Sequence, residues 1–441
     1  MGPEPETVTG AASSRGVLRR VMAGGGLNLM LRALTLGFRF GLSFYIVAFL
    51  GLEAAGIYGL AAGAVGVAPA AIGWGLNYFT AREVVGRTPD KVVALVKSRL
   101  FVTLVSLTLG SLGLAAFGLA TGNFTDPIFL LILVLLWLET IALDLYLPLI
   151  GLELATQANV IVFVRSAVWV PVIIVLGIYV PALRTLEALF VAWIVCHLLS
   201  LVLMGFFLRR WPVMAELNAP IDRNWIAARL RQSWYIYFSD LGIVGLAFLD
   251  RYIVNWILGI GATGVYTFYW SIANALQTMM QTAVVQLALP RLLKSFREPT
   301  LDNWQRALRG EIVKTGILAT SLAAAIFVAV EIVIRFDPGG RFPHYTGLLA
   351  LMMIAAVARA GSDLLNTTIT STGRDRYYAI TNVAGVAMTL GFGIFFISEF
   401  GLIGSGLSAL VTATLLVIAR AAYVRRVYRL EVAQRQAATA K

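Results

Sequence analysis

Arginines inside long apolar stretches are the side chains of this chain that could do chemistry. Arg32 and Arg39 lie seven residues apart in the first such stretch, so a helix would carry both on one face, about 10 Å apart. Guanidinium groups match the oxygens of phosphate in two-point hydrogen bonds. The two side chains therefore predict a binding site for a phosphate or pyrophosphate group. The alternative interpretation is that Arg32 is structural and extends to the lipid headgroups.

A second group of charges falls in the C-terminal half. Asp240, Asp250 and Arg251 share the seventh apolar stretch. Asp250 and Arg251 are adjacent, so on a helix they point about 100° apart and need different partners. Arg359 and Asp363, in the tenth stretch, are four residues apart and can pair within one helix. Charges in lipid are costly and usually functional, but a purely structural ion pair is the alternative for both stretches.

The fourth and fifth stretches carry Glu139, Asp144 and Arg165, which we expect to form one cluster. Carboxylates there can carry a coupling proton or sodium ion, or they can simply neutralise an arginine. The predicted substrate-binding residues are Arg32, Arg39, Arg165, Arg251 and Arg359. The predicted ion-coupling residues are Glu139, Asp144, Asp240, Asp250 and Asp363.

Catalytic chemistry is not expected. The sequence has no phosphate-binding glycine loop, no paired metal ligands and no combination of Ser, His and Asp that suggests nucleophilic catalysis. Cys196 is the only cysteine, so the chain forms no internal disulfide. Its neighbour His197 is interpreted as a packing residue. We therefore predict no cofactor, no metal site and no enzyme activity.

The elements that carry these residues are predicted to be transmembrane helices. Hydrophobic residues make up 59% of the 441 residues, charged residues only 13%, and the mean hydropathy is +0.82. A soluble protein would carry about a quarter charged residues. We predict an all-α integral membrane protein with about 12 transmembrane helices, most of about 20 residues or longer. The predicted spans are 27–50, 56–78, 99–120, 127–149, 158–180, 185–208, 233–257, 263–289, 312–334, 346–370, 377–399 and 402–423.

Positive charges are distributed unequally between the two sides of these spans. Of the 35 Lys and Arg residues, six lie within the spans, and only Arg184, Arg335 and Arg341 lie in the loops of one side. The remaining residues lie on the other side, which the positive-inside rule assigns to the cytoplasm together with both termini. The net charge of +12 would then face anionic membrane lipids, so nucleic acid is not an expected partner.

A short repeat indicates two related halves. Leu50-Gly51-Leu52-Glu53-Ala54-Ala55-Gly56-Ile57-Tyr58 is matched 208 residues later by Leu258-Gly259-Ile260-Gly261-Ala262-Thr263-Gly264-Val265-Tyr266, and each copy joins two apolar spans. Six spans per half imply two lobes related by a pseudo-two-fold axis along the membrane normal. The predicted organisation is a mobile cytoplasmic tail (1–26), an N-terminal lobe (27–208), a cytoplasmic linker (209–232), a C-terminal lobe (233–425) and a cytoplasmic tail (426–441).

The linker 209–232 is interpreted as an amphipathic helix lying at the membrane interface, with an ordinary linker as the alternative. The longest outer loop is 335–345. No segment outside the membrane is long enough for a catalytic domain, which argues against a membrane-embedded glycan polymerase.

Two stretches carry a family resemblance. The segment from Leu249-Asp250-Arg251-Tyr252-Ile253-Val254 to Pro290 resembles the start of the second lobe in polysaccharide-type flippases of the MOP superfamily, the Wzx-like O-antigen and exopolysaccharide translocases. The first copy of the repeat, followed by Ala81-Arg82-Glu83, looks like the matching N-lobe region.

The resemblance implies two six-helix lobes around a central cationic cavity. It implies alternating access that carries an undecaprenyl-pyrophosphate-type lipid-linked oligosaccharide across the bacterial inner (plasma) membrane, for O-antigen, capsule or exopolysaccharide synthesis. It also implies H⁺ or Na⁺ as a coupling ion, and a polysaccharide polymerase and a chain-length regulator as partners.

The same superfamily contains other transporters, of which a MATE-like, cation-coupled antiporter of drugs is the main alternative. Such a protein handles cations and would favour an acidic cavity, whereas Arg32 and Arg39 point to an anionic headgroup. MurJ-type flippases usually add two helices to the twelve predicted here. The major facilitator signature is absent from residues 79–99, which begin Phe79-Thr80-Ala81-Arg82-Glu83.

Overall fold

The computed structural model describes residues 27, 30–122, 124–298, 300–337 and 339–439. The predicted N-terminal tail, 1–26, lies outside the described residues. Within them the chain is helical and contains no strand. The first span is Met30–Leu50, and its last turn is the π-helix η1 (Ile46–Leu50). The helices of the N-terminal half that follow are α2 (Leu52–Gly73), α3 (Leu76–Glu83), α4 (Pro89–Thr121), α5 (Pro127–Gly151), α6 (Ala155–Phe163), η2 (Val164–Val168), α7 (Trp169–Tyr179), η3 (Pro181–Leu183) and α8 (Leu186–Phe207). The remaining helices are α9 (Val213–Leu217), α10 (Arg223–Gln232), α11 (Trp234–Leu258), α12 (Ile260–Met280), η4 (Gln281–Val285), α13 (Gln286–Phe296), α14 (Asp302–Arg335), α15 (Thr346–Ser371) and α16 (Asp375–Thr439).

The fold is that of a multi-pass membrane protein, as predicted. In the part of the chain that the structure describes, ten helices are long and apolar enough to cross a membrane. α16 is one of the ten, but it bends at Gly401 (φ +58°, ψ −138°), between the predicted spans 377–399 and 402–423. α12 carries Asn274 and Gln277 and is not among the ten. The number of twelve transmembrane helices stays a prediction.

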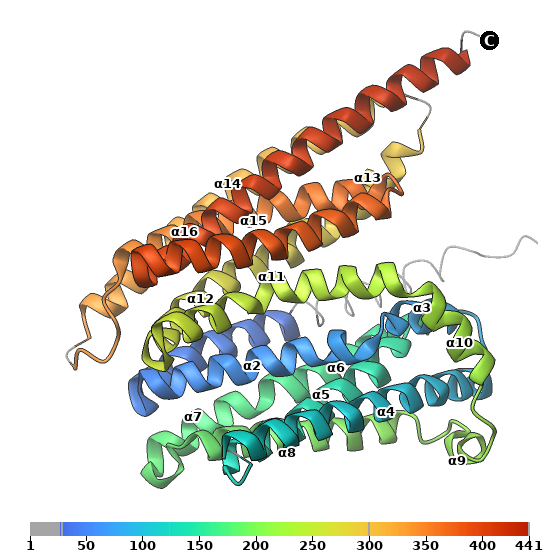
Figure 1. Ribbon diagram of the computed structural model, residues 1–441. Coiled ribbons are helices and arrows are strands. Elements are labelled where there is room, and N and C mark those ends of the chain that lie inside the picture. The colour runs from blue at the N-terminus through green and yellow to red at the C-terminus, as the bar shows by residue number, and fades with distance from the viewer. Residues whose placement is uncertain (1–26, 28–29, 123, 299, 338, 440–441) are drawn as a thin grey trace, which may run out of the picture.

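The helices form two groups that follow the order of the chain (Figure 1). Helices α2 to α8 form the lower group in this view, and α13 to α16 form the upper group. α11 and α12 lie between them and pack against α2. The upper helices slope away from the lower ones toward the right-hand end, where α10 and the C-terminus lie. The two lobes are thus closer at one end of the molecule than at the other.

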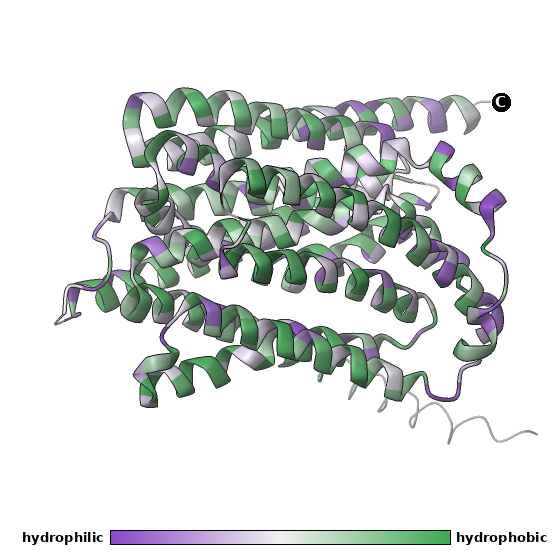
Figure 2. Cartoon of the chain, turned by 60° about the horizontal axis from the view of Figure 1, so that its bottom comes forward, coloured by the Kyte–Doolittle hydropathy of each residue, from purple (hydrophilic) through white to green (hydrophobic). Residues whose placement is uncertain are grey.

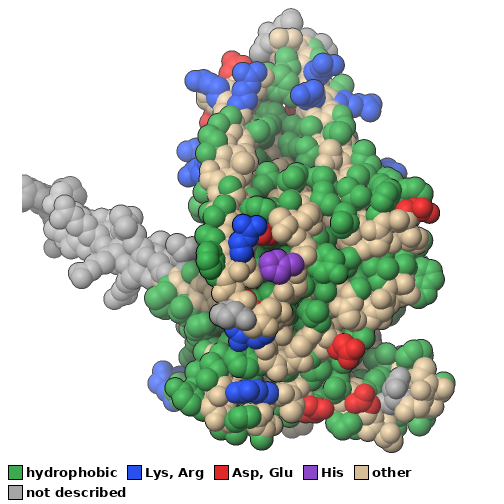
Figure 3. Space-filling model, turned by 90° about the vertical axis from the view of Figure 1, so that its left-hand side faces the viewer, with side chains coloured by type: hydrophobic (Ala, Val, Ile, Leu, Met, Phe, Trp, Pro, Cys, Tyr) green, Lys and Arg blue, Asp and Glu red, His purple; other side chains and the backbone are tan. Residues whose placement is uncertain are grey.

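Basic residues gather where the lobes diverge. We call this the basic end; it holds α3, α9, α10 and the C-terminal arm of α16. Colouring by hydropathy shows apolar residues along the helices and hydrophilic ones gathered toward this end (Figure 2). At the opposite, far end, charged side chains are scattered among hydrophobic and other surface, apart from a basic group along the upper rim of the view (Figure 3). The basic end is the side that the sequence assigns to the cytoplasm, an assignment that stays a prediction.

The segments predicted as linker and C-terminal tail are largely helical. α10 does not lie apart from the protein: the Glu83 carboxylate of α3 accepts a hydrogen bond from Trp225 (3.0 Å) and pairs with Arg229 (2.7 Å). α16 continues as a helix to Thr439, and Arg435 donates to the carbonyl of Phe296 (2.8 Å).

The repeated segment closes the far end. Gly51 (φ +92°) and Gly259 (φ +82°) start α2 and α12 with the positive φ that glycine adopts readily. A Cβ on Gly56 would lie 2.4 Å from the Ile260 carbonyl oxygen, and one on Gly264 would lie 1.8 Å from that of Leu52. These residues occupy equivalent positions in the two copies, so the contact is reciprocal, as across a two-fold axis. Only glycine allows backbones to approach this closely.

Aromatic rings reinforce the same end. Phe44 of the first span packs edge-on against Phe268 of α12 (5.0 Å between centroids) and Phe342 (5.3 Å). Phe268 is buried within a hydrophobic core that includes residues of both lobes. Apolar packing therefore joins the lobes at the far end.

Replacing Gly264 with alanine is expected to destabilise the protein by about 1–3 kcal/mol or more, because the added methyl group would overpack against the Leu52 carbonyl. The check is the melting temperature of the purified protein in detergent. Gly261→Ala is the matched control on α12, because a Cβ there meets nothing within 4 Å. Equal melting temperatures for the two variants would contradict the close contact between α2 and α12.

Candidate functional site

A cluster of three ionisable side chains lies at mid-depth in the N-terminal lobe. Glu139 of α5, Arg165 of η2 and His197 of α8 each lie near the middle of a span. The Glu139 carboxylate receives Arg165 on one oxygen (3.0 Å) and His197 Nε2 on the other (2.8 Å). Arg165 also stacks over the ring of Tyr146 (5.5 Å). Glu139 and Arg165 do come together, as the sequence predicts.

Both ring nitrogens of His197 lie near oxygen atoms. Its Nδ1 lies 3.1 Å from the Trp193 carbonyl oxygen of the same helix. Its Nε2 lies 2.8 Å from Glu139 Oε2. The contact with Glu139 joins α8 to α5 in the middle of both spans.

His197 was interpreted from the sequence as a packing residue, and the structure gives it a polar partner as well. Its burial is complete, which agrees with packing. The available signal was its place in the middle of the apolar helix α8, where an ionisable group is unusual. The 58 residues that separate it from Glu139 gave no indication of that partner.

Arg39 lies at the same depth as this cluster. It is the tenth residue of the 21-residue first span, and its side chain is exposed. Among the described residues none forms a hydrogen bond or ion pair with its guanidinium, although Glu139 and Tyr58 are near enough to interact with it electrostatically. Charged side chains at this depth almost always face the bundle interior or a water-filled cavity rather than lipid. Arg32, nearer the basic end, donates to Gln286 of the C-terminal lobe (2.7 Å).

Asp144 lies apart from this cluster. It is five residues from Glu139, which places the two carboxylates about 140° apart on α5. Asp144 pairs instead with Arg99 of α4 (2.9 Å), and both side chains are fully buried. Thr103 donates to the other carboxylate oxygen, and Arg99 donates to Asn77 (3.1 Å). The predicted single cluster is thus two clusters, and Arg99, which the charge distribution places at the inner surface, is an interior residue.

In the C-terminal lobe, Asp250 and Arg251 have different partners, as predicted. Asp250 accepts a hydrogen bond from Tyr266. Arg251 is buried, donates to the Gly59 carbonyl of α2 (2.8 Å) and lies over the ring of Trp270 (4.1 Å). Arg251 therefore joins the two lobes, and water does not reach its guanidinium in this arrangement.

The expected ion pair between Arg359 and Asp363 is not formed. Asp363 accepts a hydrogen bond from Gln277 of α12 instead. Among the described residues, none bonds to the guanidinium of Arg359, which is half-buried between Asp250 and Asp363 and interacts with both electrostatically. Asp240 lies nearer the basic end, half-buried, beside Tyr378.

Arg420 of α16 is an interior residue that the sequence placed within a span without assigning it a role. It is buried and donates to Ser362 Oγ (2.7 Å) and to Asn382 Oδ1 (2.7 Å). Because these partners are neutral, they do not compensate the charge of Arg420, which interacts electrostatically with Asp363. Across the described part of the chain, no three His, Cys, Asp or Glu side chains gather as a metal site.

The Arg99–Asp144 pair provides a test of the interior. Removing one partner leaves an uncompensated buried charge, so Asp144→Leu and Arg99→Met should each lower stability by about 3–5 kcal/mol. The double variant should recover most of this loss, because it leaves no charge unpaired. Thermal melts of the four purified proteins in one detergent measure the effect, and additive losses in the double variant would contradict the pairing.

Solved structures with this arrangement of helices are known. The inward-facing conformation of a multidrug resistance MATE family transporter of the MOP superfamily matches over 92% of this chain and 98% of that chain, with a TM-score of 0.70 and 14% sequence identity. A MATE in complex with MaL6 matches over 93% of this chain and 96% of that chain, with a TM-score of 0.59 and 16% sequence identity. The outward-facing conformation of a multidrug resistance MATE family transporter matches over 93% of this chain and 94% of that chain, with a TM-score of 0.55 and 17% sequence identity.

No protein-family model and no curated protein matches the sequence. The likeness to solved structures extends over nearly the whole length of both chains. The chain therefore has the all-helical, two-lobed fold of the MATE transporters of the MOP superfamily.

Proposed function

We propose that this chain is an alternating-access flippase for a polyprenyl-pyrophosphate-linked oligosaccharide. The observation that carries the proposal is Arg39, an exposed guanidinium without a bonded partner among the described residues, in the middle of a membrane span. A water-facing guanidinium at this depth suits the pyrophosphate that links glycan to lipid. The glycan would occupy the hydrated space between the lobes while the prenyl tail stays in the bilayer.

The balance of free charges supports an anionic cargo. Every predicted coupling carboxylate at mid-depth already accepts a hydrogen bond: Glu139 from Arg165 and His197, Asp250 from Tyr266 and Asp363 from Gln277. The guanidinium groups of Arg39 and Arg359 have no such bond among the described residues. The uncompensated charge at this depth is therefore positive, and it would repel a cationic drug.

The arrangement of the lobes supports loading from the basic end. The TM-score is 0.70 against the inward-facing MATE transporter and 0.55 against the outward-facing one. The glycine and phenylalanine contacts join the lobes at the far end. If the basic end is cytoplasmic, as the positive-inside rule predicts, this is the state that takes up cargo from the inner leaflet.

A MATE-like antiporter of organic cations is the second candidate. Two of the similar structures are of multidrug resistance transporters, and Asp240 is a half-buried carboxylate with no bonded partner among the described residues. In that case Asp240, rather than Arg39, would bind the cargo. The two candidates differ in the sign of the charge that the cargo carries.

We propose Glu139 as the carboxylate that binds the coupling ion, H⁺ or Na⁺. The charged groups around it are Arg165, which bonds to it, and Arg39, which lies near it. A cation bound at Glu139 would add one positive charge to the cluster, which would then attract an anionic headgroup more strongly. Ion binding and cargo binding would be linked, and each would favour the other by the same factor.

The function can be tested in a strain that lacks the gene. Mass spectrometry of its lipid extract should show accumulation of one polyprenyl-pyrophosphate glycan, together with loss of a surface polysaccharide. The wild-type gene should reverse both effects, whereas Arg39→Ala should not, because it lacks the group that grips the pyrophosphate. Arg39→Lys should restore transport only in part, since an ammonium cannot form the two-point bond.

The control for loss of a positive charge is Arg306→Ala, which changes an exposed residue near the start of α14. This variant should complement fully. Membrane levels of all variants must be equal. Normal lipid profiles in the deletion strain, combined with new sensitivity to cationic dyes that Asp240→Asn fails to complement, would replace the flippase by the drug antiporter.

A further inference from the structure

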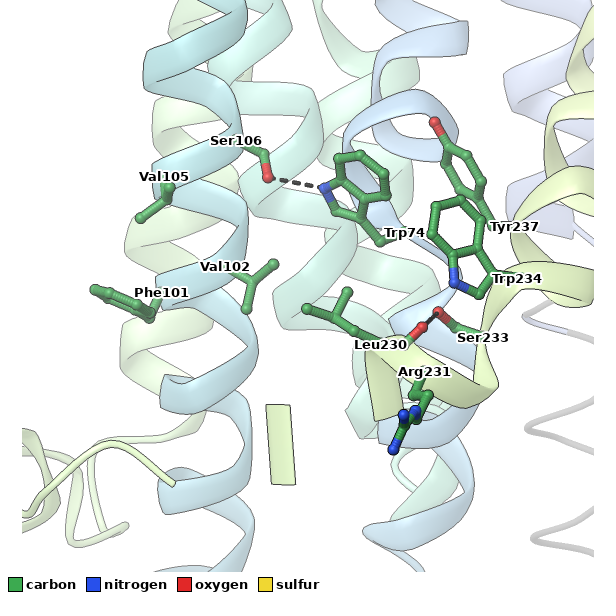
Figure 4. Close-up of a pocket in the computed structure, with 10 residues that line it drawn as sticks. All are labelled: Trp74, Phe101, Val102, Val105, Ser106, Leu230, Arg231, Ser233, Trp234 and Tyr237. Carbon is green, nitrogen blue, oxygen red and sulfur yellow. Dashed lines mark hydrogen bonds between the residues drawn. The ribbon is translucent and has the colours of Figure 1, made fainter. Parts of the chain in front are cut away.

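A pocket opens on the lipid-facing side of the protein, at the basic end, beside the junction of the two lobes. Its volume is about 460 Å³. The end of α2, the middle of α4, the end of α10 and the start of α11 line it (Figure 4). It lies outside the cluster of Glu139, Arg165 and His197, and shares no lining residue with it.

The pocket faces lipid rather than the interior between the lobes. Phe101 and Val105 of α4 are 45% and 44% exposed, and Trp234 of α11 is 50% exposed. All three lie in predicted membrane spans or at their ends. Large apolar side chains that are exposed on a membrane span favour contact with acyl chains over contact with water. We infer that lipid has access to the pocket.

A second pocket, of about 520 Å³, continues along the same helices toward the far end. Leu107 and Leu114 of α4 and Leu249 of α11 line it. From Phe101 to Leu114, α4 rises by about 20 Å, which exceeds the thickness of one leaflet's hydrocarbon, about 15 Å. The two pockets lie one after the other along α4, and we infer that together they form an apolar groove long enough for an acyl chain.

Arg231 supplies a positive charge at the mouth of this groove. It is the one charged side chain among the described residues that line the first pocket, and it points away from the aromatic rings (Figure 4). Among the described residues, none bonds to its guanidinium. Arg229, two residues earlier, pairs with Glu83 (2.7 Å) and lies over Phe79 (5.2 Å). Arg229 is thus committed to the protein, whereas Arg231 is available to a phosphate.

Both lobes build the wall of the pocket. Trp74, which ends α2, stacks on Tyr237 of α11 (5.2 Å between centroids, 21° between planes). The Tyr237 hydroxyl donates to the Ala71 carbonyl (3.1 Å). Trp74 has φ +52°, an uncommon conformation for a bulky residue, and its indole donates to Ser106 (2.9 Å). Because residues of both lobes form the wall, the shape of the pocket depends on how the two lobes are arranged relative to each other.

We propose that this groove binds an anionic phospholipid of the leaflet at the basic end. An acyl chain lies along α4 and α11, and the lipid phosphate pairs with Arg231. Tryptophan and tyrosine at the mouth lie where amphipathic rings are favoured, at headgroup depth. A lipid that binds a pocket shared by both lobes stabilises the lobe arrangement that forms the pocket.

The test is retention of lipid by the purified full-length protein, measured by native mass spectrometry after equilibration with phosphatidylglycerol or phosphatidylcholine. We expect phosphatidylglycerol to be retained at least five-fold more than phosphatidylcholine. Arg231→Gln should remove that preference. Arg223→Gln, an exposed arginine of the same helix outside the pocket, is the matched control and should keep it.

A second pair of variants tests the acyl-chain groove. Val105→Trp places a bulky side chain in the groove and should reduce retention of phosphatidylglycerol by a similar factor. Leu109→Trp, on α4 and 65% exposed but outside both pockets, should not. Size-exclusion profiles and melting temperatures identify variants that fail to fold, and the two pairs are independent of each other.

Equal retention of both phospholipids by the wild-type protein would overturn the proposal, as would normal retention by both Arg231→Gln and Val105→Trp. A polyprenyl phosphate that is retained through Arg231 while phosphatidylglycerol is not would also overturn it, because the groove would then hold the tail of a cargo lipid. The outcomes with the two phospholipids do not depend on whether the protein transports a lipid-linked glycan.

Discussion

The contact between α2 and α12 is the constraint on which the rest of the structure depends. Gly56 and Gly264 let the two helices meet backbone to backbone, each against the start of the other helix. The lobes are joined there and by the Phe44–Phe268 contact, and the upper helices slope away from the lower ones toward the basic end (Figure 1). Nearer the basic end the lobes also touch through the Trp74–Tyr237 stack. The pair of glycines thus fixes a backbone contact between the lobes at the far end.

Interior arginines of this protein fall into two groups according to their partners. Arg99 and Arg251 are fully buried and bond to Asp144 and to the Gly59 carbonyl, respectively. A buried charge without partners would cost several kcal/mol, so these bonds are what allow the arginines to remain inside. Arg39 has no comparable bond among the described residues. Its side chain is exposed, so hydration rather than a protein partner would stabilise its charge. Exposure at mid-depth therefore distinguishes a residue that can bind cargo from one that holds helices together.

Hydropathy and the short repeat were sufficient to predict the helical membrane fold and the turns at Gly51 and Gly259, because both depend on local sequence. Pairings across helices were predicted less well. Periodicity gives the face of a helix on which Asp144 lies, but it does not say that Arg99, 45 residues earlier, faces it. Arg359 and Asp363 have the right spacing to pair, yet tertiary packing places Gln277 of α12 against Asp363. His197 was undervalued for the same reason, since its partner comes from another helix.

A fold shared with multidrug resistance transporters does not fix the charge of the cargo. The scaffold provides two lobes and a space between them, and function depends on the side chains that line that space. In this chain the carboxylates at mid-depth already accept hydrogen bonds from the protein. Among the described residues, none bonds to the exposed guanidinium of Arg39, which lies near Glu139. The proposed pyrophosphate cargo rests on this positive charge, whereas a site for organic cations would need a carboxylate that the protein leaves without a bonded partner.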